Sequence, residues 1–293
     1  MILKDVRKNK IESFFIVSIF IIVIMIGVYY LCLYFNLGVY SFVIALLFAS
    51  LTAFFSYYNS DKIVLSLNGA RKATDEQDKL ISTILDNLCI AAGLPRPMLY
   101  VIDDLSPNAF ATGRNPEHAV ICLTTGLLEK MNKYELEGVI AHELSHIKNY
   151  DILLSTVVTV FVGFVVILSD MLSRFMFFSS RDNDNDSKSG VIVALISVVF
   201  LILSPIFATL MQLAISRKRE YLADSSAIEL TRNPEGLISA LEKLTADTDP
   251  LEAANKSTAH MYIVNPLKGK KESSLFSTHP SLESRIERLQ NIQ

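Results

Sequence analysis

A long stretch near the start of the chain contains no charged residue. Residues 13–60 include no Asp, Glu, Lys, Arg or His, and most positions are aliphatic or aromatic. A helix that crosses a bilayer needs about 20 consecutive apolar residues. The stretch is therefore long enough for two membrane spans, and residues 36–38 (Asn-Leu-Gly) predict the turn between them.

Two further stretches without charge follow, at residues 152–169 and 190–216, and the whole chain is 51% hydrophobic. This pattern predicts an α-helical multi-pass membrane protein with four spans. The first span is too long for the apolar core of a signal peptide and no cleavage site follows it, so we expect it to be retained. The third span is the least regular, because Asp170 and Arg174 lie at its far end, and partial insertion is the alternative.

Clusters of basic residues precede the first span and follow the fourth. Lys4, Arg7, Lys8 and Lys10 precede the first span, and Arg217, Lys218 and Arg219 follow the fourth. Since loops rich in Lys and Arg stay in the cytoplasm, both chain termini and residues 61–151 are predicted to be cytoplasmic. The loop at residues 181–188 is acidic on balance and suits the outside. The predicted location is the cell (inner) membrane, with the lipid bilayer as a partner.

Net charge and cysteine content exclude other classes of function. The net charge of −3 gives no reason to expect a nucleic-acid partner. Cys32, Cys89 and Cys122 show no spacing typical of a metal site or a disulfide framework, which favours a reducing compartment.

Residues 142–146 read His-Glu-Leu-Ser-His within a helical apolar pattern. His142 and His146 are four residues apart, so they lie one turn apart on the same helix face. Their ring nitrogens can then reach one Zn²⁺ at about 2.0–2.1 Å. Glu143 is rotated to one side, where it can take a proton from the attacking water. With only five histidines in the chain, chance is a poor explanation, and a metal site is predicted.

A hydrolytic zinc site needs a third protein ligand and an open position. The extended form of the motif would place a third histidine at position 152, which is Ile152, so that form is excluded. After the fourth span, Glu220 and Asp224 lie one turn apart on a predicted helix. Glu220 is the candidate ligand, and Asp224 can hydrogen-bond a ligand histidine without binding the metal itself. The alternative is that both carboxylates neutralise the basic residues 217–219.

The region between the second and third spans reads as mixed helix and strand. Capping-box patterns beginning at Thr74 and at Asn132 predict two helices. Short strands are expected at residues 98–102 and 119–123, and residues 108–113 are expected to form a further strand at a sheet edge.

Four motifs together resemble one protein family. They are His-Glu-Leu-Ser-His at 142–146, Arg-Glu-Tyr-Leu-Ala-Asp at 219–224, Asn-Ala-Phe-Ala-Thr-Gly at 108–113 and Thr-His-Pro-Ser-Leu-Glu-Ser-Arg-Ile at 278–286. With the four apolar segments, they resemble the HtpX family of membrane zinc endopeptidases, related to the CAAX prenyl proteases, over essentially the whole chain. The resemblance implies an α+β, zincin-type (gluzincin-like) metallopeptidase domain. It also implies one Zn²⁺ per chain held by His142, His146 and Glu220, with Glu143 as the catalytic base.

The resemblance also indicates where a substrate binds. The segment at residues 108–113 resembles an edge strand beside the cleft, so the backbone of Asn108, Ala109 and Phe110 is a candidate for pairing with an extended substrate. The implied substrates are proteins, namely membrane proteins or the misfolded cytoplasmic parts of them, as in protein quality control.

His279 and Arg285 are further catalytic candidates. Either can stabilise the oxyanion, or hold Asp224 and the substrate. The alternatives are a helix-entry residue before Pro280 for the histidine and a surface ion pair for the arginine.

The predicted organisation is a cytoplasmic domain built from two segments. Residues 1–60 form two spans, 61–151 the first segment of the peptidase domain, 152–216 a transmembrane hairpin, and 217–293 the second segment. One alternative function is a transporter or channel whose histidines bind metal for passage, which the scarcity of ionisable residues within the spans disfavours. The other is a catalytically inactive zinc-binding scaffold, which has no need of Glu143.

Overall fold

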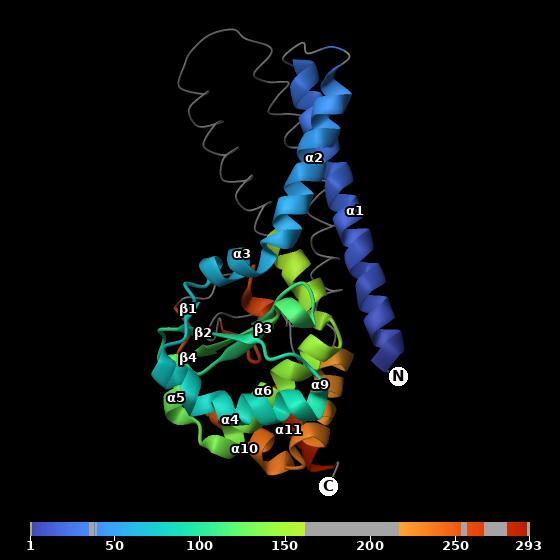
Figure 1. Cartoon of the computed structure of the whole chain (residues 1–293). Coiled ribbons are helices and arrows are strands. Elements are labelled where there is room, and N and C mark those ends of the chain that lie inside the picture. Colours follow the sequence, from blue (N-terminus) through green and yellow to red (C-terminus); the bar gives the residue numbers. More distant parts are fainter. Residues whose placement is uncertain are drawn as a thin grey trace.

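The computed structural model describes residues 2–34, 38, 40–161, 217–252, 257–266 and 280–291. Within these ranges the chain forms a pair of long helices and an α+β domain at one end of that pair (Figure 1). The predicted fourth span, the loop at residues 181–188 and the end of the third span lie outside the described residues.

The two long helices are α1 (Ile2–Tyr34) and α2 (Tyr40–Tyr58). Each contains a segment long and apolar enough to cross a membrane, at Val6–Ile26 and Tyr40–Tyr58. Their outward faces expose large apolar side chains such as Phe14, which is 68% exposed. A third apolar helix, Asp151–Phe161, packs against the middle of α1, at Ile16, Phe20 and Ile24. Exposed apolar surface of this extent suits contact with lipid.

The domain contains a four-stranded sheet in the order β1-β2-β4-β3. Its strands are β1 (Arg71–Lys72), β2 (Met98–Ile102), β3 (Ala109–Thr112) and β4 (Val120–Thr124). β2 and β4 are parallel, whereas β1 and β3 each pair antiparallel with their neighbours. The predictions of strands at 98–102 and 119–123 and of an edge strand within 108–113 are confirmed, with β4 shifted by one residue.

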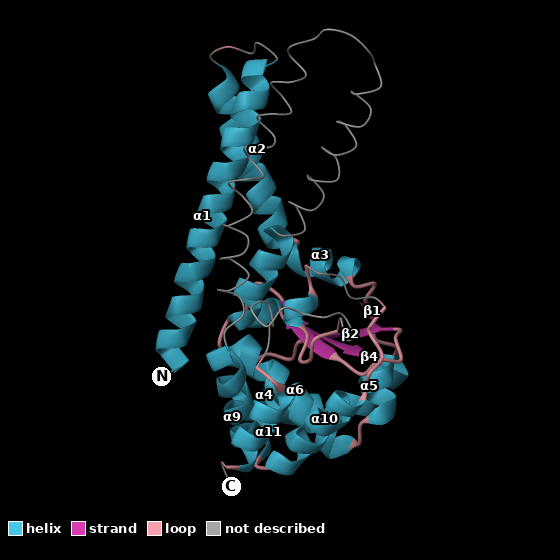
Figure 2. Ribbon diagram, turned by 180° about the vertical axis from the view of Figure 1, so that it is seen from behind, coloured by secondary structure: helices cyan, strands magenta, loops and turns pink. Residues whose placement is uncertain are grey.

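Both faces of the sheet are covered, so its strands alternate between two hydrophobic clusters. On β3, Ala109 and Ala111 face the cluster shared with helices α4 and α6, while Phe110 faces the opposite cluster. On β4, Ile121 and Cys122 alternate in the same way. The layer of helices below the sheet is seen from behind in Figure 2.

The helices of the domain come from two separate segments of the sequence. They are α3 (Ser60–Leu67), α4 (Asp75–Ala92), α5 (Thr125–Lys130), α6 (Lys133–Lys148), α9 (Arg217–Thr231), α10 (Pro234–Ala246) and α11 (Leu282–Gln290), with short 3₁₀ turns at Pro116–His118 and Ala259–Met261. α6 is central, and α10 approaches it so closely that a Cβ on Gly138 would lie 2.8 Å from the backbone nitrogen of Leu237. One core contains residues from both α6 and the helices after residue 216, and this shared core brings the motif residues together.

Candidate metal centre and active site

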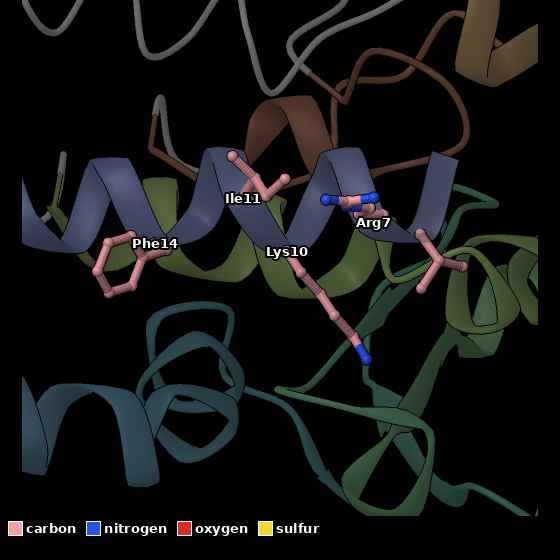
Figure 3. Close-up of a pocket in the computed structure, with 5 residues that line it drawn as sticks. Arg7, Lys10, Ile11 and Phe14 are labelled. Atoms are coloured by element: carbon pink, nitrogen blue, oxygen red, sulfur yellow. The ribbon is translucent and has the colours of Figure 1, made fainter. Parts of the chain in front are cut away.

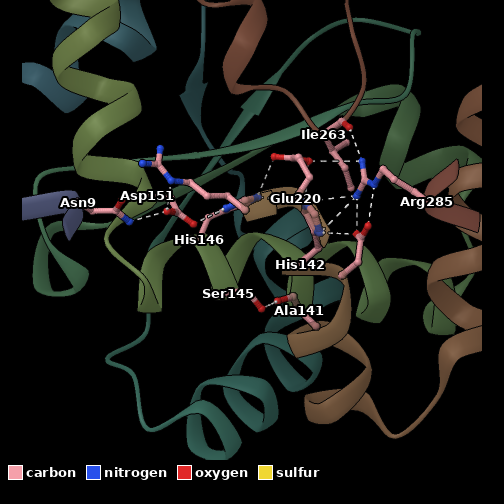
Figure 4. Close-up of polar contacts among 11 residues, drawn as sticks. Asn9, Ala141, His142, Ser145, His146, Asp151, Glu220, Ile263 and Arg285 are labelled. Atoms are coloured by element: carbon pink, nitrogen blue, oxygen red, sulfur yellow. Dashed lines mark hydrogen bonds and ion pairs between the residues drawn. The ribbon is translucent and has the colours of Figure 1, made fainter. Parts of the chain in front are cut away.

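Three candidate ligands converge between α6 and α9 (Figure 4). Nε2 of His142 and Nε2 of His146 are 3.2 Å apart. The Glu220 carboxylate from α9 lies 3.8 Å from the first of these nitrogens and 3.6 Å from the second. One ligand atom from each of the three residues lies within 4.8 Å of the other two. The structure therefore assembles the predicted set of three, two nitrogens and one carboxylate.

Each histidine ring has a carboxylate at its Nδ1, and this carboxylate determines whether Nε2 carries a lone pair. Nδ1 of His142 lies 3.0 Å from Asp224 Oδ1, and Nδ1 of His146 lies 3.0 Å from Asp151 Oδ2. A neutral histidine that donates from Nδ1 presents a lone pair at Nε2. Two such lone pairs 3.2 Å apart repel each other unless a proton or a metal ion lies between them. Tetrahedral zinc would hold its nitrogen ligands about 3.3 Å apart, so these residues fit a bound zinc ion.

Arg285, on α11, holds Asp224 in place. Its side chain is fully buried, and its Nε and Nη2 donate to the two oxygens of Asp224 at 2.9 and 2.6 Å. Nη1 donates to the carbonyl of Ile263 and lies 3.6 Å from the Glu220 carboxylate. The alternative of a surface ion pair for Arg285 is therefore wrong. The other catalytic candidate, His279, lies outside the described residues.

The electrostatics of the buried carboxylate of Asp224 follow from this pairing. Burial alone would raise its pKa, but the charge of Arg285 and the hydrogen bond with His142 outweigh burial and lower it. Asp224 is thus ionised at neutral pH and can hold the His142 ring in one orientation.

Glu143 lies between the ligand cluster and the edge strand. It is 1% exposed, and burial, with a smaller contribution from the charge of Glu220, raises its pKa to about 7. His146, Arg285 and a hydrogen bond from the backbone N–H of Ala111 act in the opposite direction. A carboxyl group with a pKa near 7 can both accept and release a proton at neutral pH.

The two histidines differ in their affinity for a proton. Burial lowers the pKa of His142. Burial also opposes charge on His146, but its bond with Asp151 and the charge of Glu220 raise the pKa of His146 to about 9. The cluster therefore attracts positive charge, and a metal ion would displace a proton from His146 on binding.

The predicted substrate-binding residues lie beside this centre, on β3 and just before it. Asn108 is buried, and its side-chain nitrogen donates to the carbonyl of Val264. The carbonyl of Ala109 accepts from the N–H of Ile263, and the ring of Phe110 packs edge-on against Tyr262. The chain around Ile263 thus covers the outer edge of β3 at Ala109.

Sequence reasoning missed Asp151, which holds His146. It lies five residues after that histidine and not one helical turn away. Between them α6 ends, and Tyr150 adopts a left-handed conformation with φ of 60° that turns the chain back. A single acidic residue at the entry to an apolar segment was the available signal.

The chain resembles known proteases along its whole length. The family model described as Peptidase family M48 matches residues 75–293. A "Protease HtpX homolog" of Dictyoglomus turgidum is 46% identical over 284 residues, covering 97% of this chain and 92% of that protein. A "Protease HtpX homolog" of Listeria monocytogenes serotype 4a is 40% identical over 304 residues, covering all of both chains. Among solved structures, S. mikatae Ste24p matches with a TM-score of 0.49 and 19% identity, covering 98% of this chain and 67% of that chain.

Proposed function

The chain belongs to peptidase family M48 and is a metalloprotease of the HtpX type, and from this premise we propose that it is a zinc-dependent membrane endopeptidase. One observation carries the proposal. Two histidine nitrogens face each other at 3.2 Å with a carboxylate opposite them, and Glu143 lies beside them. This is the donor set of a hydrolytic zinc site, with room for one Zn²⁺ per chain.

Each residue of the site is proposed to have a separate role in hydrolysis. A bound zinc ion supplies a Lewis acid that polarises the scissile carbonyl and lowers the pKa of water. Glu143 takes the proton of the attacking water and delivers it to the leaving amine. Asp224 and Asp151 keep the rings of His142 and His146 oriented.

An extended substrate is proposed to bind along β3. Beyond the section covered by Ile263, the N–H of Ala111 faces Glu143. A peptide paired with this edge would be gripped through its backbone, with little selection of sequence. We therefore propose protein substrates, including membrane proteins and their misfolded parts.

The proposed location is the cell membrane, with the active site cytoplasmic. In this arrangement residues 61–151 and 217–293 form one domain, and 152–216 return through the bilayer. The basic residues at the start of α1 support it, and two of them line a hollow there (Figure 3). Arg7 and Lys10 line this hollow together with Ile11 and Phe14. Cations next to apolar side chains suit the anionic cytoplasmic surface of a bilayer.

The test is cleavage of an unfolded protein by the full-length enzyme in detergent, with zinc restored after chelation. Glu143→Gln removes the base but no ligand, so it should retain zinc and lose cleavage by about 10²- to 10⁴-fold. Glu137→Gln, half-buried on the same helix, is the control and should cleave normally. Equal cleavage by Glu143→Gln would refute the mechanism. Zinc binding without cleavage by the wild type would support the inactive scaffold instead.

A further inference from the structure

The first long helix reaches the metal centre. Asn9 on α1 is 2% exposed, and its Nδ2 donates to Asp151 Oδ1 at 2.6 Å and to the carbonyl of Asn149 at 2.9 Å. The other oxygen of Asp151 is 3.0 Å from Nδ1 of His146. Asn9, Asp151 and His146 thus form a continuous line of hydrogen bonds from α1 to the ligand cluster (Figure 4).

A second contact joins α1 to the helix that carries Glu220. Glu12 Oε2 accepts from Arg219 Nη2 at 2.7 Å, and Nε of Arg219 lies 3.5 Å from Asp151 Oδ1. Arg219 immediately precedes Glu220 on α9. Glu12 therefore contacts α9 at the residue next to the carboxylate ligand.

The geometry of Asn9 indicates a role beyond packing. Its two amide hydrogens serve two acceptors on the same turn, the one that brings Asp151 back toward His146. A carboxylate that orients a ligand histidine must itself be held, because it can otherwise rotate about its own side-chain bonds. Among the described residues, Arg219 also approaches Oδ1 of Asp151, but its Nε lies 3.5 Å away, too far for a good hydrogen bond.

We propose that Asn9 and Glu12 are positioning residues of the metal centre, so that the first membrane helix completes the active site of the domain. Asn9 fixes Asp151 and, through it, the ring of His146, whereas Glu12 holds Arg219, the neighbour of Glu220 on α9. This inference rests on the proposed zinc site. It implies that displacement of α1 within the membrane weakens metal binding.

Zinc affinity of the full-length protein in detergent, measured by competition with a chelator, tests the proposal. Asn9→Ala should raise the dissociation constant for zinc about 10- to 100-fold, the range expected when a partner of a ligand is lost. Glu12→Gln, which keeps the size of the side chain, should shift it in the same direction. Arg7→Gln, exposed on the same helix, is the matched control and should leave it unchanged.

A transposed pair separates positioning from packing. Asn9→Asp alone places two carboxylates opposite each other, and Asp151→Asn alone places two amides opposite each other. Each single variant should weaken zinc binding. In the double variant, the amide at position 151 can donate to the carboxylate at position 9 and accept from His146, although the bond to the carbonyl of Asn149 is not restored. Zinc should therefore bind more tightly to the double variant than to Asp151→Asn.

Two comparisons decide the outcome. The thermal midpoint of each metal-free variant is measured beside its zinc affinity, and a lower midpoint with unchanged affinity for Asn9→Ala and Glu12→Gln overturns the proposal. If the wild type and Glu143→Gln bind zinc but the double variant gains nothing over Asp151→Asn, the line of bonds through Asn9 is refuted. If the wild type itself binds no zinc, the proposed function fails instead.

Discussion

Among the single residues of the site, Arg285 is a fully buried cation whose charge must be matched. Its guanidinium is fully buried and forms two parallel bonds with Asp224. Lysine cannot reproduce this fork, so Arg285→Lys should leave one buried oxygen poorly satisfied. We expect the free energy of unfolding to fall by about 2–3 kcal/mol and the affinity for zinc to fall about tenfold.

Denaturant unfolding and chelator competition measure these two effects. Arg288→Lys is the control, because Arg288 is exposed on the same helix and lies over the ring of Tyr221. A variant at position 285 as stable as this control would show that the fork contributes little.

Local spacing predicts the geometry of the site only where its residues share one helix. His142, Glu143 and His146 are fixed relative to one another by a single helix, so their spacing alone predicts their geometry. Glu220 required the membrane topology and a family resemblance, since nothing local relates α9 to α6. Asn9 had no signal at all, because its partner is 142 positions away and on another element.

At the scale of elements, α6 depends on the cap at its first turn. Glu135 accepts from the backbone of Asn132, from Ser239 and from Lys243, at 2.7, 2.6 and 2.7 Å. Burial would raise its pKa, but these bonds outweigh burial and lower it below the ordinary value of 4.5. The ionised carboxylate of Glu135 therefore caps α6 and also binds two side chains of α10, which holds the two helices together.

This shift predicts a dependence of stability on pH. Because the pKa of Glu135 is lower in the folded protein, the unfolded chain binds more protons, so stability rises with pH in this range. The contribution should be complete above pH 4.5, the unfolded value, and should disappear as the pH falls through the folded value. Metal-free Glu135→Gln should be less stable than wild type by about 1 kcal/mol at pH 7.

Denaturant unfolding at several pH values measures the difference. The gap between wild type and Glu135→Gln should close in acid, and Glu137→Gln should show a smaller gap at pH 7. A gap that stays constant down to the lowest pH at which the protein folds would contradict the assignment of the shift to Glu135.

Elements with a strong local pattern were predictable, and short ones were not. The capping boxes at Thr74 and Asn132 mark the starts of α4 and α6 as the structure has them. β1 was missed because two residues carry no alternation, and its pairing with β2 depends on the fold around it. The covered edge of β3 at Ala109 also escaped prediction, because the segment that covers it lies far away in the sequence.

At the scale of the whole molecule, the contacts of α1 restrict the topology. Asn9 and Glu12 touch the domain near the start of α1, and Arg114 of the domain bonds the carbonyl of Tyr58 at the end of α2. The two helices thus leave the domain and return to it as a hairpin (Figure 1). If this hairpin crosses the bilayer, the N-terminus and the domain lie on the same side, as the basic residues at the start of α1 also predict.

Chemical labelling of intact cells with a membrane-impermeant maleimide tests this arrangement. Tyr40→Cys lies at the far end of the hairpin, where Tyr40 is 74% exposed, and Lys79→Cys lies on the exposed face of α4. In a Cys32→Ser background, the first should react from outside and the second only after permeabilisation. Cys89 and Cys122 should not react with the maleimide because both are buried. Burial also raises the pKa of both thiols, that of Cys89 to about 11. Reaction of Lys79→Cys in intact cells would place the domain outside and reverse the topology, whereas protection of both positions would mean that the hairpin does not cross the membrane.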